Sequence, residues 1–395
     1  MIGICRKILI WLSFTFIFLI PLSQYLSVRL LLFLVLFSIL AFKTKIFSYV
    51  FRQSWDLLLY TAILIIGLIY SEDKVQGLRV LETSFSLVAV PFLFFGFTKG
   101  ESHVYRYSTT FFTAGIFIAC IVVSINAFIN YLSTGSFESF KYYELTDLLG
   151  LQPTYMAYYV IMSITYLVFV LYYNKNLSPF IFIESVLFLF VILLLTGGRT
   201  AFISLILVSS YFLLKYLLDL KTIRKSYTVI LVACIMIGTI VFSNTSMFKS
   251  VMKNSDYWER SILWKSAINA NPNPIFGVGT GDYNLVLNEY YRSQELVDYA
   301  SGNYNSHNQY LHQYFSNGIF GLIALLIIIG RPIYLSFKSQ NPLGILIVFP
   351  FVIYGMTEVF LGRYQGVVFF VLCHQIAVSH YYSSKQNFDL KAVSE

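Results

Sequence analysis

Long apolar runs separated by short polar breaks dominate this chain. Twelve of these runs approach the length of about 20 residues that a helix needs to cross a bilayer. Uninterrupted apolar runs of this length are typical of helices in lipid rather than of the amphipathic helices of soluble domains. The pattern predicts an all-α, polytopic integral membrane protein with about 12 transmembrane helices, at 8–22, 28–42, 55–70, 79–97, 107–130, 152–173, 178–196, 200–218, 227–243, 308–329, 342–360 and 366–382.

One long polar segment, residues 244–306, separates the ninth predicted span from the tenth. We expect it to form a large, partly helical periplasmic loop on a single membrane domain that covers residues 1–395. Arg6 and Lys7 precede the first apolar run, but no small-residue cleavage site follows. The start of the chain is therefore predicted to be an uncleaved first helix rather than a signal peptide.

Composition agrees with a membrane protein. Hydrophobic residues make up 57% of the chain, charged residues only 12%, and the mean hydropathy is +0.71, whereas a typical soluble domain is about 25% charged. A soluble globular enzyme, a disordered chain and a charged nucleic-acid binder are excluded. With the N-terminus inside, 16 of the 27 basic residues but only five of the 19 acidic residues lie on the inner side. The net charge of +8 thus follows the positive-inside rule and predicts cytoplasmic N- and C-termini.

The chain shows no pattern for a metal or a cofactor. Cys5, Cys120, Cys234 and Cys373 lie in or beside apolar runs, so we expect small packing residues and no disulfide or metal framework. No Asp-x-Asp motif occurs. The adjacent acids Glu72-Asp73 are predicted to be a solvated pair in an outer loop.

Three arginines lie at or near the predicted outer face, where basic residues are depleted. They are Arg199, Arg260 and Arg363. An arginine at the centre of a membrane costs about 2.5–3.5 kcal/mol, and less near the surface. A lipid-linked diphosphate would offset this cost, because guanidinium groups bind phosphate through two parallel hydrogen bonds. The alternatives are a snorkelling side chain that marks a helix end, and for Arg363 an ion pair with Glu358.

Arg260 belongs to a segment that we expect to be an amphipathic helix on the outer leaflet. Trp264 follows four residues later and would share its helix face, with the tryptophans of the segment at headgroup level. The alternative for Arg260 is a salt bridge to Glu259 or Asp256. The nearby run Gly277–Gly281 lacks the lysine of a phosphate-binding loop and is predicted to be a turn.

His307 and His312 stand where the long loop enters the tenth span. They are five residues apart and do not share a helix face as a zinc pair would. His307 lies near the start of a helix, whose dipole favours the neutral, proton-accepting imidazole. A histidine that only caps the helix is the alternative. The remaining histidines, His103, His374 and His380, are assigned no role.

Four features together resemble the O-antigen ligase and O-antigen polymerase superfamily. They are His307-Asn308 followed after nine residues by Gly-Ile-Phe-Gly at 318–321, the Gly-Gly-Arg-Thr-Ala break at 197–201, Glu-Arg-x-x-x-Trp at 259–264 with Asn-Pro-Ile-Phe-Gly-Val-Gly at 273–279, and the single long loop before the histidine. The resemblance covers residues 150–330.

The resemblance implies a GT-C-type glycosyltransferase of the bacterial inner membrane with its active site on the periplasmic side. Its partners would be a glycan donor linked to undecaprenyl diphosphate, a lipid A-core or other glycan acceptor, and membrane lipids, without nucleic acid. Carried over to this chain, Arg199 and Arg260 would hold the diphosphate, and His307 would be the base or would position the acceptor. Asn308 matches the motif, and Arg363 and Glu358 are candidate supporting residues. No metal or cofactor is implied, and a single displacement would invert the anomeric centre.

Other functions share these features. An O-antigen or capsule polymerase, or a protein O-oligosaccharyltransferase, would use the same donor with another acceptor. The long loop before His307 favours a ligase. A twelve-span transporter or lipid flippase belongs to a different class; these tend to show two similar halves, which the sequence lacks.

Overall fold

The computed structural model describes residues 2–95, 102–173, 179–218, 232–233, 237–238 and 257–394. Within these ranges the chain forms helices and turns and no strand. The described elements fall into two compact units. The first comprises residues 1–13, 28–105 and 255–395, and the second comprises residues 14–27 and 106–254.

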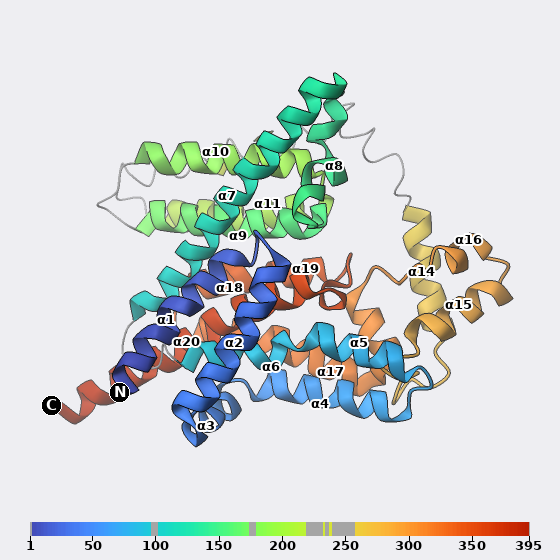
Figure 1. Ribbon diagram of the computed structural model, residues 1–395, viewed down its shortest axis with the longest axis horizontal. Coiled ribbons are helices and arrows are strands. Elements are labelled where there is room, and N and C mark those ends of the chain that lie inside the picture. Colours follow the sequence, from blue (N-terminus) through green and yellow to red (C-terminus); the bar gives the residue numbers. More distant parts are fainter. Residues whose placement is uncertain are drawn as a thin grey trace. The chain divides into compact units, whose positions relative to one another are not determined.

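The first unit contains most of the helices (Figure 1). The first two helices of the chain, α1 (Ile2–Leu19) and α2 (Gln24–Phe42), have residues in both units. The others are α3 (Thr44–Gln53), α4 (Trp55–Tyr70), α5 (Lys74–Ser84), α6 (Ser86–Phe94), α14 (Tyr257–Asn269), α15 (Tyr283–Ser293), α16 (Val297–Ser301), α17 (Gln309–Lys338), α18 (Pro342–Val348), α19 (Pro350–Tyr354), η4 (Phe360–Gly362) and α20 (Tyr364–Ser394).

The second unit is built around α9, which packs against α10 and α11. Nearly every side chain of α9 is buried, as expected for a helix that is apolar on all sides. The elements of this unit are α7 (Ser102–Thr134), η2 (Phe137–Phe140), α8 (Tyr142–Thr146), η3 (Asp147–Leu149), α9 (Pro153–Tyr173), α10 (Pro179–Thr196) and α11 (Arg199–Leu218).

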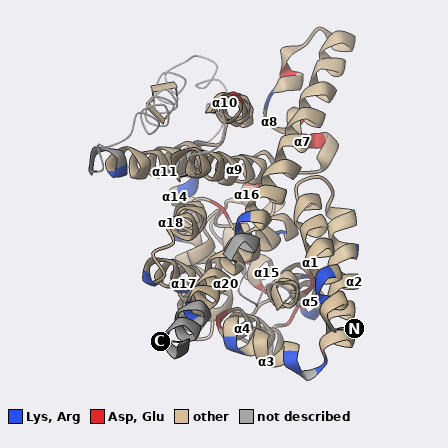
Figure 2. Cartoon of the chain, turned by 90° about the vertical axis from the view of Figure 1, so that its left-hand side faces the viewer, with Lys and Arg blue, Asp and Glu red and all other residues tan. Residues whose placement is uncertain are grey.

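Six stretches of the described chain are long and apolar enough to cross a membrane. They match six of the predicted spans, and they are Gln24–Phe42, Lys74–Phe94, Arg106–Thr134, Pro153–Tyr173, Pro179–Thr196 and Gln309–Lys338. Charged residues are sparse along these helices (Figure 2). The protein is therefore an all-helical membrane protein.

The remaining predicted spans are shorter or differ in form. Two of them correspond to short apolar helices, Thr200–Lys215 and Pro342–Tyr354. A third, 55–70, is α4, which meets the criteria of a span only together with α3, across a bend of 86°. Two more lie in α1 and α20, which do not meet those criteria, and 227–243 lies almost entirely outside the described residues.

The core of the first unit is an antiparallel pair, α4 and α17, with α20 packed against α17 (Figure 1). At the end of α4, Thr280 Oγ1 donates a hydrogen bond of 2.7 Å to the Leu64 carbonyl and accepts one of 3.0 Å from Asn317 Nδ2, early in α17. At the start of α4, Asp56 contacts Arg331, late in α17. The two ends of α4 are therefore held by different parts of α17.

α17 is broken at Asn317 and Gly318, whose backbone angles are not helical. The segment 274–279 supplies partners for the backbone groups that the break releases. Val278 N–H donates to the Phe315 carbonyl (2.9 Å) and Gly279 N–H to the Ser316 carbonyl (2.8 Å). In return, Ile319 N–H donates to the Pro274 carbonyl (3.0 Å). We call this pairing of residues 274–279 with residues 315–319 the clasp.

Candidate functional site

His307 lies in the short connection between α16 and α17. Its φ of 42° is in the left-handed region that non-glycine residues rarely adopt. Its own N–H donates to Asn305 Oδ1 (2.8 Å), and the buried N–H of Ser306 donates to Tyr283 Oη (2.8 Å). These bonds on either side hold the unusual backbone in place, and they leave the imidazole 37% exposed.

Asn308 is the N-cap of α17. Its Oδ1 accepts hydrogen bonds from the N–H groups of Tyr310 (2.9 Å) and Leu311 (3.0 Å). These are two of the N–H groups that have no partner within the helix, and Asn is among the best residues for accepting them. These two capping bonds therefore explain why an asparagine follows the histidine.

Glu358 faces the imidazole from the turn that follows α19. Glu358 Oε2 lies 3.6 Å from His307 Nδ1, and Glu358 Oε1 accepts from the N–H of Val359 (3.2 Å). The acid keeps 21% of its side chain exposed. The pair is thus a histidine and a carboxylate at a solvent-accessible position, brought together from residues 51 apart in the sequence.

Gln309 joins this turn to the start of α17. Its N–H donates to the Gly355 carbonyl (2.7 Å), and its Oε1 accepts from the N–H of Leu361 (2.8 Å). Tyr310 Oη adds a bond of 2.9 Å to the Val352 carbonyl. The sequence analysis did not single out Gln309. Its position directly after the His-Asn pair is the only signal that could have drawn attention to it.

Arg363 follows the same turn but does not pair with the acid. Its side chain is exposed, and within the described residues the ion-pair partner of Glu358 is His307. The alternative interpretation of Arg363 as the salt partner of Glu358 therefore has no support from the geometry.

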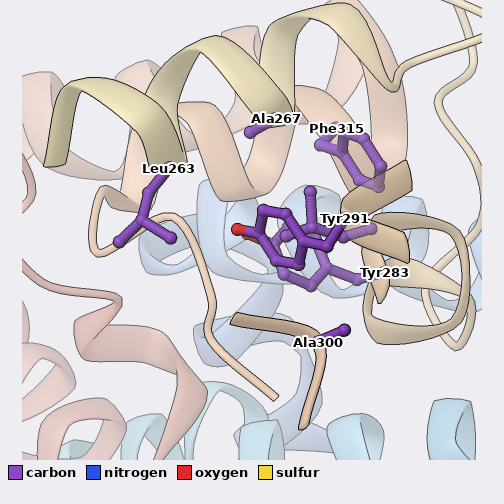
Figure 3. Packing of buried hydrophobic residues seen from close by; sticks show 7 residues of the cluster. Leu263, Ala267, Tyr283, Tyr291, Ala300 and Phe315 are labelled. Atoms are coloured by element: carbon purple, nitrogen blue, oxygen red, sulfur yellow. The ribbon is translucent and has the colours of Figure 1, made fainter. Parts of the chain in front are cut away.

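Arg260 is half-buried near the start of α14. α14 packs on α15 and on α17 through Leu263 and Ala267, which belong to a buried cluster with Tyr283, Tyr291 and Phe315 (Figure 3). The predicted helix is present, and Trp264 is partly buried against this cluster; its position at headgroup level stays a prediction. Arg260 therefore projects from a helix that is anchored by its own protein core.

Tyr283 connects this core to the backbone beside His307. Burial raises the pKa of Tyr283 to about 12, so the phenol stays neutral over the physiological range. Its ring lies 4.0 Å from that of His312, between centroids, and 5.1 Å from that of Phe315. His312 thus packs against the Tyr283 ring from within α17.

Arg199 is the first residue of α11, directly after the break at Gly197 and Gly198. Gly197 has a positive φ of 67°, so a glycine suits this turn between α10 and α11. Arg199 belongs to the second unit, and its side chain lies outside the described ones. The association of Arg199 with His307 and Arg260 stays a prediction.

Glu72 and Asp73 lie directly before α5, where their backbone N–H groups are hydrogen-bonded and Asp73 caps the helix. Their N–H groups donate to Asp282 Oδ2 and Oδ1, both at 2.7 Å, and Asp73 Oδ1 accepts from Gln76 N–H (2.8 Å) as the N-cap of α5. Within the described ranges no group of three or more His, Cys, Asp or Glu residues is arranged to hold a metal ion. Cys120 and Cys373 are buried free thiols, as predicted for packing residues, whereas Cys5 is partly exposed.

Comparison with known proteins defines the class. The fold is that of a helical membrane protein, and residues 185–326 match the O-antigen ligase family, whose members are glycosyltransferase-like ligases and polymerases. The match confirms the resemblance of the motifs to the O-antigen ligase and polymerase superfamily. It includes Arg199, Arg260 and His307 but not Glu358.

A relative of Haemophilus influenzae, described as an uncharacterized protein, is 26% identical over 204 residues. The alignment covers 45% of this chain and 50% of the relative. The chain thus spans about half the length of the curated relative that it matches.

Proposed function

We propose that the protein is an O-antigen ligase-like glycosyltransferase. It moves a glycan from undecaprenyl diphosphate to a hydroxyl of lipid A-core, or of a similar acceptor, on the periplasmic face of the bacterial inner membrane. The observation that carries this proposal is the His307–Glu358 pair at the entrance to α17, with an Nδ1–Oε2 separation of 3.6 Å. His307 lies within residues 185–326, which match the O-antigen ligase family.

In this reaction His307 accepts the proton of the acceptor hydroxyl. A carboxylate beside Nδ1 favours the tautomer with its proton on that nitrogen, which leaves the lone pair of Nε2 to act as base. The separation of 3.6 Å is longer than a hydrogen bond, and such contacts often tighten only when substrate binds. Glu358 then also stabilises the imidazolium that forms.

As the acceptor oxygen bonds to the anomeric carbon, the bond from that carbon to the diphosphate oxygen breaks. Negative charge develops on the leaving diphosphate, and the guanidinium groups of Arg260 and Arg199 bind it. A diphosphate leaves readily, so the reaction needs neither a general acid nor a metal. Attack opposite the leaving group inverts the anomeric centre.

Transfer by the purified protein tests this mechanism. The substrates are a glycan on undecaprenyl diphosphate and candidate acceptors, with product followed by gel mobility in the presence of a chelator. We expect transfer to persist in chelator and to fall about 100- to 1,000-fold in Arg260→Ala and in Arg199→Ala, since each removes a charged donor from the leaving group. His307→Ala should lose at least about 100-fold, the usual contribution of a general base.

Arg292→Ala is the matched control, because Arg292 is exposed on α15 and has no part in the mechanism. Loss of transfer in chelator, or equal losses in Arg260→Ala and Arg292→Ala, would contradict the proposal. A ladder of products extended on the lipid carrier would identify a polymerase, and a glycosylated polypeptide would identify a protein O-oligosaccharyltransferase.

A further inference from the structure

α3 lies across the start of α4 instead of continuing it. The two helices meet at 86°, and a helix of ten residues is about 15 Å long, half the thickness of the hydrocarbon core of a bilayer. When α4 crosses the membrane, α3 is therefore too short and too strongly inclined to cross it as well. With α4 upright in the membrane, α3 would run nearly parallel to the membrane plane.

The two apolar faces of α3 have different surroundings. Ile46 and Val50 are buried, with 0% and 3% of their surface exposed. Phe47 and Phe51, four residues apart on the neighbouring face, are 42% and 65% exposed. Trp55, directly after the bend, is 45% exposed. The face with Ile46 and Val50 thus packs on the protein. The face with Phe47 and Phe51 stays partly exposed, although the Phe47 ring also contacts the Phe92 ring edge-on, at 5.7 Å between centroids.

The charge on this part of the chain is entirely positive. Lys43, Lys45 and Arg52 are exposed, and no acidic residue precedes Asp56 in the sequence. Asp56 is itself buried and forms an ion pair of 2.6 Å with Arg331. Among the described residues, no carboxylate forms an ion pair with Lys43, Lys45 or Arg52.

Contacts with other helices fix the orientation of α3. Tyr49 Oη donates to the Phe94 carbonyl (3.1 Å). Ser54 Oγ, at the bend, accepts from Gln375 Nε2 of α20 (2.9 Å), and the guanidinium of Arg331 lies over the ring of Trp55 at 5.3 Å. The aromatic face and the basic residues consequently keep a defined direction relative to α4.

We propose that α3 is an interfacial helix that binds the headgroups of anionic phospholipids, at the end of the α4–α17 pair opposite His307. Phe47, Phe51 and Trp55 enter the boundary between headgroups and acyl chains, where aromatic side chains are favoured. Lys45 and Arg52 contact the lipid phosphates. A basic residue near an anionic surface contributes about 1 kcal/mol, or about fivefold in affinity.

Lipid binding to the purified full-length protein tests the selectivity. Native mass spectrometry would compare phosphatidylglycerol with phosphatidylcholine of identical acyl chains. In the double variant Lys45→Gln/Arg52→Gln, the preference for phosphatidylglycerol over phosphatidylcholine should be about 25-fold weaker than in the native protein, at about fivefold for each charge. The control Lys265→Gln/Arg292→Gln removes the same charge from exposed residues of α14 and α15 and should keep it. Equal losses in both variants, or no loss in the α3 variant, would overturn the proposal.

A second measurement tests the position of the helix independently of its charge. Spin labels at Phe51→Cys or Lys45→Cys, in a chain whose four native cysteines are replaced by alanine, are examined in phosphatidylglycerol nanodiscs. The label at 51 should be relaxed by oxygen and the label at 45 by a water-soluble nickel chelate. A label at 51 that is accessible to nickel places α3 in water, and one shielded from both reagents places it under protein. Either result contradicts lipid binding.

Discussion

His307 and Asn308 are neighbours in the sequence with separate tasks in the structure. Asn308 caps α17, while His307 stands outside the helix with a positive φ and faces Glu358. The cap marks the start of α17, so His307 lies in the connection one residue before the N-cap. In the proposed mechanism, a motif that is continuous in sequence thus combines a catalytic histidine with an asparagine that caps the helix.

Glu358 is expected to act through His307. Glu358→Gln should lower kcat about 10- to 100-fold with little change in KM, since the imidazole remains but the selection of its tautomer is lost. Glu358→Asp should recover part of the rate. Glu289→Gln, an exposed acid on α15, is the control. Steady-state transfer kinetics decide the question, and a Glu358→Gln enzyme with unchanged kcat would remove Glu358 from the mechanism.

Asn308 should prove to be a structural residue. Asn308→Ala should destabilise the protein by about 1 kcal/mol through loss of the N-cap, whereas Asn308→Asp should keep the stability because Asp accepts the same bonds. Thermal unfolding in detergent measures the difference. If Asn308→Asp were stable yet as inactive as His307→Ala, the amide would have a chemical role in addition to the cap.

At the scale of elements, the clasp explains why two glycine-containing motifs occur together in this chain. Gly277 and Gly318 both have positive φ, 75° and 61°. A Cβ on Gly277 would overlap the Ser316 carbonyl, and a Cβ on Gly318 would overlap the Ile275 carbonyl. The two segments approach so closely because neither side has a side chain at these positions. The run of glycines is thus a docking segment for the break in α17, more specific than the turn predicted from sequence.

Gly318→Ala should therefore destabilise the protein, by about 1–3 kcal/mol, since it combines an unfavourable φ with a collision against backbone. Gly330→Ala is the matched control in the same helix, because nothing lies within 4 Å of its Cβ position. At position 330, alanine should leave the free energy of unfolding unchanged or raise it by up to about 1 kcal/mol. Unfolding temperatures in detergent test the pair, and similar values for both variants would contradict the clasp.

Much of the helical structure could be predicted, because apolar runs such as 107–130 and 152–173 need no distant partner to be recognised. The predictions were weakest where a helix is interrupted. α18 ends at Val348 and α19 begins at Pro350, and α3 turns by 86° into α4. Hydropathy is averaged along the chain and does not register the direction of a bend, so broken and short spans were counted as if they were continuous.

At the scale of the whole molecule, a buried ionic group ties the first unit together at the end opposite His307. Asp56 Oδ1 accepts from Arg331 Nη1 (2.6 Å), and Asp56 Oδ2 lies 2.8 Å from His374 Nε2. Asp56 and His374 are fully buried, so α4, α17 and α20 are joined where no water competes. His374 was assigned no role from sequence; it is instead part of this ionic group.

Removing the Asp56 carboxylate should leave the Arg331 guanidinium without its counter-ion. Asp56→Ala is expected to cost about 3–5 kcal/mol, as breaking a buried ion pair typically does. Glu138→Ala breaks the more exposed pair with Lys141 and should cost less than about 1 kcal/mol. Unfolding of the detergent-purified variants measures both. Equal stability of the two variants would mean that the buried group contributes no more than a surface pair.

Arg199 and Arg260 belong to different units, so the proposal that both bind one diphosphate is tested at the scale of the whole molecule. If both bind the same diphosphate, their effects on kcat/KM should not add, and a double-mutant cycle with alanine should show a coupling energy of about 0.5–3 kcal/mol. Arg260→Ala combined with Arg292→Ala is the control and should be additive. Additive losses for Arg199→Ala and Arg260→Ala would separate the two guanidinium groups.

The sequence by itself determined the membrane class, most of the long helices, the superfamily and the position of His307, because these depend on local runs and on motifs within a few residues. Only the tertiary structure brought Glu358 to the imidazole, paired the two glycine segments and joined Asp56 to His374. His307 and Glu358 are 51 positions apart in the sequence, the two glycine segments are about 40 apart, and Asp56 and His374 are 318 apart. Packing of distant helices decides which of the many carboxylates and carbonyls meets which partner, and no local pattern encodes that choice.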